Sequence, residues 1–275
     1  MRCCLGPIAA RALPPPRALR AAAALSRHLH VAVVGAGPGG FYTAKYLLAS
    51  GPADTRVTLV DALPTPYGLV RSGVAPDHPE VKSVTNDFSA VAADPRLSFL
   101  GGVTIGGGGG GGGGGVAVAD LRGLFDAVVL SVGAAGDRAL GLPGEELEGV
   151  LGARAFVSWY NGHPDFAALA PDLSVEDVVI VGQGNVAIDC ARILCKTVAE
   201  LQHTDIAAHA LAALARSRVR RVHLVGRRGH VQASFTMKEL REVTRLADAA
   251  FVVSPEELAQ GRTAARNLRR QGAPA

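Results

Sequence analysis

Two glycine-rich loops constrain the fold of this chain most, because each lies between a predicted strand and a predicted helix. The first loop, GAGPGG at residues 35–40, follows an apolar run at 30–34 and precedes a helical stretch at 41–49. Gly35, Gly37 and Gly40 supply the GxGxxG pattern of a dinucleotide-binding βαβ unit. In such a unit, backbone N–H groups and a helix N-terminus face a pyrophosphate, so the loop predicts a phosphate cradle.

The strand predicted at residues 57–60 ends in a carboxylate. Asp61 lies 21 residues after Gly40, where an acid in this fold accepts hydrogen bonds from the ribose hydroxyls of an adenosine. Because a carboxylate repels a 2′-phosphate, we expect this lobe to prefer FAD or NAD to NADP.

The second loop, GQGNVA at residues 182–187, has the related form GxGxxA. It follows the predicted strand at 177–181, and its helix is predicted to run to about Leu201. The next predicted strand, at 219–225, is followed by Arg227 and Arg228 in place of an acid. Since a guanidinium binds phosphate bidentately and keeps its charge, this lobe should choose NADP over NAD. A solvated arginine pair on a turn is the alternative interpretation.

The two βαβ units predict an α/β protein with two Rossmann-like dinucleotide-binding lobes. We expect an FAD-binding lobe over residues 30–140 and an NADP-binding lobe over 141–275, with an irregular C-terminal end. Ten consecutive glycines at 106–115 offer no side chain to pack, so they predict a loop in the first lobe. Two such lobes suit electron transfer from NADPH to a flavin.

The N-terminal segment has the composition of a mitochondrial transit peptide. Residues 1–30 contain five arginines and no acid, and the first acid of the chain is Asp54. We therefore expect a transit peptide over residues 1–29 and a location in the mitochondrial matrix, with peripheral contact to the inner membrane left open. A disordered tail is the alternative. No run of 18 apolar residues occurs, so no transmembrane segment is predicted.

Other function classes lack their residue patterns. Cys190 and Cys195 lie five apart, which is not a CxxC spacing, so we expect buried free thiols and no metal site. No nucleophile–base arrangement or paired carboxylate is evident, so no catalytic residue is assigned. Trp159 is expected to anchor a core or an interface rather than stack on a cofactor. The basic C-terminal residues lack interleaved aromatics, so no nucleic-acid binding is expected.

Four further motifs resemble the adrenodoxin reductase family, the FAD-containing, NADPH-dependent ferredoxin reductases of mitochondria. They are YGLVR at 67–71, GVAPDHPEVK at 73–82, RAFV with WYNG at 154–162, and VGRRG at 225–229. The resemblance covers roughly residues 30 to 245. The family continues well beyond this length, so we expect the FAD lobe of this chain to be incomplete.

The resemblance also implies roles for individual positions. Contacts to FAD fall on Gly39, Asp61, Leu69 and Ile105, although the family usually has Ala and Glu at the first two. Contacts to NADP fall on Gln183, Gly184, Asn185, Val186, Arg227, Arg228 and Glu239, and ferredoxin docking falls on Arg241. Residues 31–215 carry a net charge of −9 and residues 216–275 a net +8, a polarity that can steer an acidic ferredoxin.

The leading hypothesis is therefore a flavoprotein that passes electrons from NADPH through FAD to a mitochondrial two-iron two-sulfur ferredoxin. In the family, this transfer serves steroid-forming monooxygenases and iron–sulfur assembly. A truncated form that binds NADP or ferredoxin without turnover is one alternative. A flavin oxidoreductase similar to the glutamate synthase small subunit is another, because that protein has a motif similar to GVAP.

Overall fold

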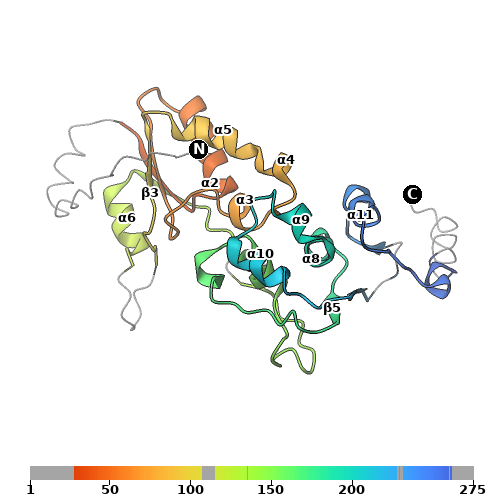
Figure 1. Cartoon of the computed structure of the whole chain (residues 1–275). Helices are drawn as coiled ribbons and strands as arrows, with labels where there is room; N and C mark the ends of the chain where they lie inside the picture. Colours follow the sequence, from red (N-terminus) through yellow and green to blue (C-terminus); the bar gives the residue numbers. More distant parts are fainter. Residues whose placement is uncertain are drawn as a thin grey trace, which may run out of the picture. The chain divides into compact units, whose positions relative to one another are not determined.

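The computed structural model describes residues 28–106, 115–134, 136–227, 229, 232–259 and 261. It divides into two compact units (Figure 1). The first contains the described residues up to Gly68 and those from Val84 to 134, and the second contains Leu69–Ser83 and the described residues from Gly136 onward. The predictions for residues 1–27, for most of the glycine run and for Arg228 lie outside the described residues.

The first unit is built on a parallel sheet with the strand order β3-β2-β1-β4. Helices α2 and α5 pack against this sheet and against each other, while α6 packs on β4. The elements are β1 (His30–Val34), α2 (Pro38–Ser50), β2 (Arg56–Val60), α5 (Val84–Ala92), β3 (Leu97–Leu100), α6 (Val118–Leu124) and β4 (Ala127–Leu130).

Strands β1 and β2 are buried over four consecutive residues each. Continuous burial is typical of central parallel strands, because both faces of the sheet are covered. The apolar runs VAVV and VTLV supply these residues, and Thr58 is the polar exception. Its hydroxyl forms a hydrogen bond with His30 Nε2 at 2.9 Å, so the buried polar atom is satisfied.

The second unit contains a two-stranded parallel sheet of β5 and β6. Its core is formed by Trp159, Tyr160, Ile193 and Leu201 with their apolar neighbours. The elements are α3 (Leu69–Ser72), α4 (Pro79–Lys82), α7 (Ala153–Tyr160), η1 (Pro164–Phe166), β5 (Asp177–Val181), α8 (Asn185–Cys195), α9 (Val198–Leu201), α10 (Ala208–Leu214), β6 (Arg221–Val225) and α11 (Met237–Val243).

Strands β5 and β6 are less covered than β1 and β2. Val179 and Val181 on β5 and Val225 on β6 are exposed in the described part of the chain. Trp159, in contrast, is 2% exposed and stacks on Phe156, so the prediction that it anchors a core is confirmed. No helix among the described residues is both long and apolar enough to cross a membrane.

The structure differs from the sequence-based expectation in helix α8 and in the segment Leu69–Ser83. The helix predicted to reach Leu201 ends at Cys195, because Thr197 caps a separate helix and forms a reciprocal capping box with Glu200. The segment Leu69–Ser83 belongs to the second unit, although the predicted FAD lobe ran unbroken from 30 to 140. Its ion pairs explain this placement, since Lys82 contacts Asp205 at 2.7 Å.

Candidate functional site

The first glycine loop joins the carboxyl end of β1 to α2. Gly35 has a φ of +102°, and a Cβ there would lie 2.3 Å from the Ser131 carbonyl oxygen. A Cβ on Gly40 would lie 1.9 Å from the Gly35 oxygen. Both positions therefore require glycine, the first for the turn and the second for close packing of the helix on the strand.

Gly37 and Gly39 face more open space. Gly37 is the N-cap of α2, and a Cβ there would meet no atom closer than 3.9 Å. The corresponding nearest distance at Gly39 is 3.8 Å. The first N–H groups of a helix have no partner within it, so this loop and helix end form a site suited to a phosphate.

Asp61 follows β2 and lies beside the first loop, as expected. Its Oδ2 accepts a hydrogen bond from the Ala36 N–H at 2.7 Å, and its Oδ1 accepts one from the Leu63 N–H at 2.9 Å. The carboxylate thus links the first glycine loop to the loop that follows β2, at the carboxyl edge of the sheet. Each oxygen has a further lone pair, so both can still accept a hydrogen bond from a hydroxyl group.

The two other predicted FAD contacts have distinct settings. Leu69 is the first residue of α3 and is exposed, in the second unit. Ile105 forms an isolated parallel bridge with Val116 in the first unit. Contact of either residue with FAD stays a prediction.

The second glycine loop joins β5 to α8. The Gly182 N–H donates to the Val225 carbonyl at 2.8 Å, and Gly184 is the N-cap of α8 with no atom within 4 Å of an added Cβ. Asn185 and Val186 form the first turn of the helix, and Val186 is half exposed. The loop is thus fixed by β6 and open at the helix N-terminus.

The end of β6 lies against this loop. A Cβ on Gly226 would lie 2.0 Å from Gln183 Cδ, so the glycine leaves room for that side chain. Arg227 follows directly and is exposed. The structure therefore brings Gln183 and the position before Arg227 together, whereas Arg228 lies outside the described residues.

The loop is also tied to the segment that leads into α11. The Ser234 N–H donates to the Gln183 carbonyl at 2.8 Å, and the Thr236 N–H donates to Asn185 Oδ1 at 2.9 Å. Thr236 is the N-cap of α11 and accepts from the Glu239 N–H. These contacts place Glu239, a predicted NADP contact, in the first turn of a helix that starts at the second glycine loop.

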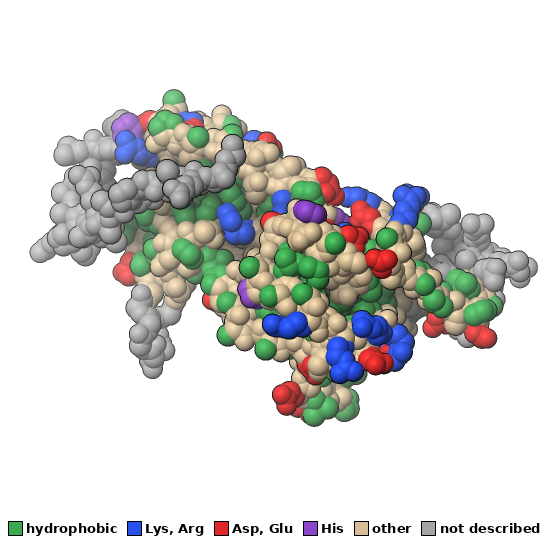
Figure 2. Space-filling model, viewed as in Figure 1, with side chains coloured by type: hydrophobic (Ala, Val, Ile, Leu, Met, Phe, Trp, Pro, Cys, Tyr) green, Lys and Arg blue, Asp and Glu red, His purple; other side chains and the backbone are tan. Residues whose placement is uncertain are grey.

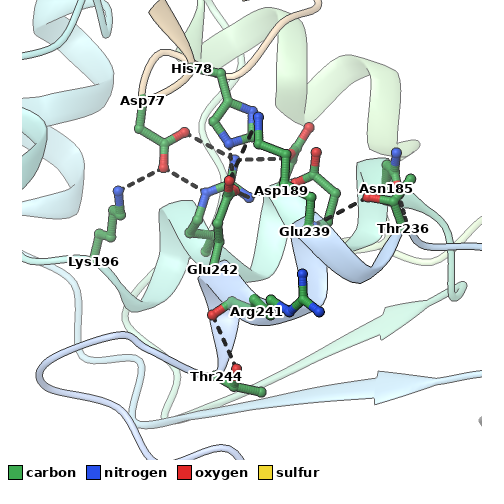
Figure 3. A network of polar contacts seen from close by, with 12 residues as sticks. Asp77, His78, Asn185, Asp189, Lys196, Thr236, Glu239, Arg241, Glu242 and Thr244 are labelled. Carbon is green, nitrogen blue, oxygen red and sulfur yellow. Dashed lines mark hydrogen bonds and ion pairs between the residues drawn. The ribbon is translucent and has the colours of Figure 1, made fainter. Parts of the chain in front are cut away.

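Glu239 belongs to an ion network around one buried arginine (Figure 3). Arg192 on α8 is 1% exposed. Its Nε donates to Asp77 Oδ2 at 2.6 Å and its Nη2 to Asp189 at 2.7 Å. Its Nη1 donates to Glu239 at 3.3 Å. Lys196 and His78 complete the network, by contacts to Asp77 at 2.8 Å and to Glu242 at 2.7 Å.

The network shifts the pKa values of two of its carboxylates in opposite directions. Burial alone would raise the pKa of Asp77, but hydrogen bonds from Arg192 and Lys196 outweigh burial and lower it to about 2. At Asp189, burial outweighs the attraction of Arg192, so the pKa is raised. Figure 2 shows acidic, basic and histidine side chains intermixed on the surface over α8, α9 and α11. Charged groups are therefore present both in the buried network and on the surface of this region.

A group of carboxylates forms here that no local sequence pattern indicates. Four of them surround Arg192, from a loop, α8 and α11: Asp77, Asp189, Glu239 and Glu242. Ligand atoms of His78, Asp189 and Glu239 lie within 4.8 Å of one another. Arg192 already supplies a cation to two of these three groups, so the arrangement is explained without a metal ion.

The remaining predicted residues lie on the surface or in the core. Arg241 is an exposed residue of α11, and its role in docking stays a prediction. Cys190 is buried and Cys195 is partly buried, both without a disulfide. Burial raises the pKa of the Cys190 thiol to about 12, with a further contribution from Asp189. The expectation of free thiols is confirmed for both residues, and the expectation of burial is confirmed for Cys190.

Comparisons with known proteins identify the family to which the chain belongs. A model of the family named pyridine nucleotide-disulphide oxidoreductase matches residues 29–247. The mitochondrial NADPH:adrenodoxin oxidoreductase of Arabidopsis thaliana is 52% identical over 236 residues, which are 86% of this chain and 47% of that protein. The human protein of the same name is 52% identical over 225 residues, which are 82% and 44% of the two chains.

A solved structure agrees with this relationship. The Mycobacterium tuberculosis protein FprA, in complex with NADPH, matches with a TM-score of 0.80 and 45% identity, over 85% of this chain and 51% of FprA. The chain spans about half the length of the curated relatives that it matches. The expected α/β Rossmann-like fold and the resemblance to the adrenodoxin reductases are confirmed. The chain belongs to the pyridine nucleotide-disulphide oxidoreductase family and is homologous to the NADPH:adrenodoxin oxidoreductases and to FprA.

Proposed function

We propose that this chain carries the two nucleotide sites of an NADPH-dependent ferredoxin reductase, with FAD in the first unit and NADP in the second. The observation that carries the proposal is the contrast between two similar loops. The first is followed by Asp61 at the end of β2, and the second by Arg227 and Arg228 after β6. Bound FAD supplies the conversion of a nicotinamide hydride into single electrons for an iron–sulfur partner.

The residues of the first unit fit FAD. The backbone at Gly37 and Gly39 is approachable, because an added Cβ would meet no atom closer than 3.8 Å. The N-terminus of α2 favours the pyrophosphate. Asp61 is held by two backbone N–H groups, so its carboxylate is fixed in place to accept ribose hydroxyls. These contacts support FAD or NAD over NADP in this unit.

The residues of the second unit fit NADP. The N-terminus of α8 is open beside Gly184, which suits a pyrophosphate. Arg227 follows β6 and is exposed, so its guanidinium is available to bind a 2′-phosphate through two hydrogen bonds. Binding of the 2′-phosphate by this guanidinium favours NADPH over NADH, because NADH lacks that phosphate.

The partner and location follow from the homologues and from charge. The relatives are named mitochondrial adrenodoxin oxidoreductases, so we infer a mitochondrial ferredoxin as electron acceptor. The exposed Arg241 and the basic region from residue 216 onward would attract an acidic ferredoxin. The Arg-rich segment at residues 1–29 would direct the chain to the matrix, and its fusion to a reporter tests this directly.

The decisive experiment measures the affinity of the purified chain for NADPH and NADH, together with its flavin spectrum. Changing Arg227 and Arg228 to Ala should weaken NADPH binding by roughly one to three orders of magnitude, since a charged contact contributes about 1.5–3 kcal/mol. NADH binding and flavin content should change little. Arg220→Ala is the matched control, because Arg220 is an exposed arginine just before β6.

Other results of these measurements would contradict the proposal. An equal loss for both nucleotides would assign the two arginines to the fold rather than to the 2′-phosphate. No loss for either nucleotide would make them a solvated pair. A chain that purifies without flavin and does not support NADPH-dependent cytochrome c reduction with added ferredoxin would refute the reductase function for these 275 residues.

A further inference from the structure

Asp77 fixes the plane of the Arg192 guanidinium. Nε and Nη2 of Arg192 donate to the two oxygens of Asp77, at 2.6 and 3.0 Å. The side chains are 2% and 4% exposed. A two-point contact between planar groups leaves little rotational freedom, and the low exposure excludes competing water. The direction of the third nitrogen, Nη1, is therefore determined by Asp77.

That third nitrogen faces α11. Arg192 Nη1 donates to Glu239 Oε2 at 3.3 Å and lies 3.6 Å from Glu242 Oε2. Glu239 lies in the first turn of α11, and the Thr236 N–H that precedes this turn is bonded to Asn185 in the second glycine loop. Arg192 thus connects a loop more than a hundred residues away in sequence to a carboxylate beside the proposed NADP site.

Charge balance makes this contact consequential. Four carboxylates face Arg192, and in the described part of the chain Lys196 contacts one of them, Asp77. His78 and Lys238 contact Glu242, but the guanidinium is the group that lies between Glu239 and Asp189. Without it, the like charges of these two carboxylates would favour displacement of the Glu239 side chain. The orientation of the Glu239 side chain therefore depends on Arg192.

We propose that Arg192 is a positioning residue for the nicotinamide nucleotide, because it holds the Glu239 carboxylate in place on the helix that starts at the second glycine loop. The proposal rests on the NADP site proposed above. A carboxylate there accepts hydrogen bonds from hydroxyl groups of the nucleotide, and NADPH and NADH share these groups apart from the 2′ position. Loss of the positioning should therefore weaken both nucleotides, unlike loss of Arg227 and Arg228.

A double-mutant cycle tests whether Arg192 acts through Glu239. The variants are Arg192→Lys, which keeps the charge but loses the planar fork, Glu239→Gln, and the two combined. Each single change should raise the Kd for NADPH and for NADH about ten-fold, the size expected for one lost hydrogen bond to a charged group. The combined variant should bind no worse than the weaker single variant.

A second route covers the case in which Arg192→Lys fails to fold. Asp77→Asn removes the two-point contact without changing Arg192, and it should raise the Kd for both nucleotides in the wild-type background but not in the Glu239→Gln background. Asp177→Asn is the matched control, because Asp177 makes the same two-point contact to Arg221 on an exposed part of β5 and β6. It should leave both affinities unchanged.

The outcomes separate this proposal from the function on which it rests. Three results would overturn the positioning role. The first is a combined variant whose rise in Kd equals the product of the two single rises. The others are single variants with unchanged affinities, and a loss of affinity confined to NADPH. In each of these cases a wild-type chain that still prefers NADPH leaves the proposed function standing. A wild-type chain that binds neither nucleotide overturns both.

Discussion

Replacing Asp77 by Asn tests how strongly the buried ion network stabilises the second unit. The contacts with Arg192 and Lys196 lower the pKa of Asp77 from an ordinary 3.8 to about 2, although burial opposes them. At about 1.36 kcal/mol per pKa unit, this corresponds to about 2 kcal/mol of favourable interaction with the ionised carboxylate. We expect Asp77→Asn to lower the free energy of unfolding by about that amount at pH 7.

The same pKa gives the direction of the pH dependence. Because the folded-state pKa of Asp77 lies below its unfolded-state value, its contribution is fully present above roughly pH 4 and is lost as the pH falls through about 2. The difference in unfolding free energy between the wild type and Asp77→Asn should be constant near neutral pH. It should shrink as both proteins are acidified through this range.

Asp177→Asn is a control, because it removes the same kind of aspartate–arginine contact from an exposed position. Asp177 also binds an arginine at two points, but its side chain is 45% exposed and that of Arg221 is 58% exposed. Hydrogen bonds from Arg221, with His223, lower the pKa of Asp177 as well. Solvent screening weakens an exposed pair, so the control should change the unfolding free energy by little more than the error of measurement.

Urea unfolding followed by tryptophan fluorescence measures both variants. Trp159 is the single tryptophan of the chain and is buried in the core of the second unit, so its emission reports that unit. Equal losses of stability for Asp77→Asn and Asp177→Asn would refute the argument from burial. So would a difference for Asp77→Asn that stays the same from neutral pH down to about pH 2.

Two further predictions concern other parts of the chain. Gly40→Ala should lower the thermal unfolding midpoint measured by circular dichroism, since its Cβ would lie 1.9 Å from the Gly35 oxygen, whereas Gly39→Ala should be tolerated because its Cβ has 3.8 Å of space. Cys190 should resist iodoacetamide at about pH 8 until urea unfolds the chain, because burial and Asp189 raise its pKa to about 12. Mass spectrometry of the labelled peptides checks this, and rapid native labelling of Cys190 would contradict it.

The strands next to the glycine loops could be predicted from sequence alone. β1 and β5 have the predicted bounds, because an apolar run that ends in a glycine turn marks the end of a parallel strand without ambiguity. Strand β6 begins at Arg221 rather than at 219. The N–H groups of Arg220 and Arg221 both donate to the carbonyl of Glu176, the residue before β5, so the regular pairing of the two strands starts at Asp177 and Arg221.

The break between α8 and α9 has a local signal in the sequence. Thr197 and Glu200 have the spacing of a capping box, which marks a helix start inside an apolar stretch. Helical periodicity alone continues through this point, so it predicted one helix to Leu201. A capping signal of this kind should override periodicity when the two disagree.

The ion network had no local signal of its geometry, because its members come from distant parts of the sequence. Arg192 nevertheless lies in the apolar helix sequence NVAIDCARILC, and a buried arginine needs carboxylates to compensate its charge. Helix α8 supplies only Asp189, so further acids had to come from elsewhere. The motif at 73–82 contains an acid before a proline-initiated helix, Asp77. An unsatisfied charge on an apolar helix face can therefore indicate which remote motif packs there, and here it also accounts for the placement of Leu69–Ser83 in the second unit.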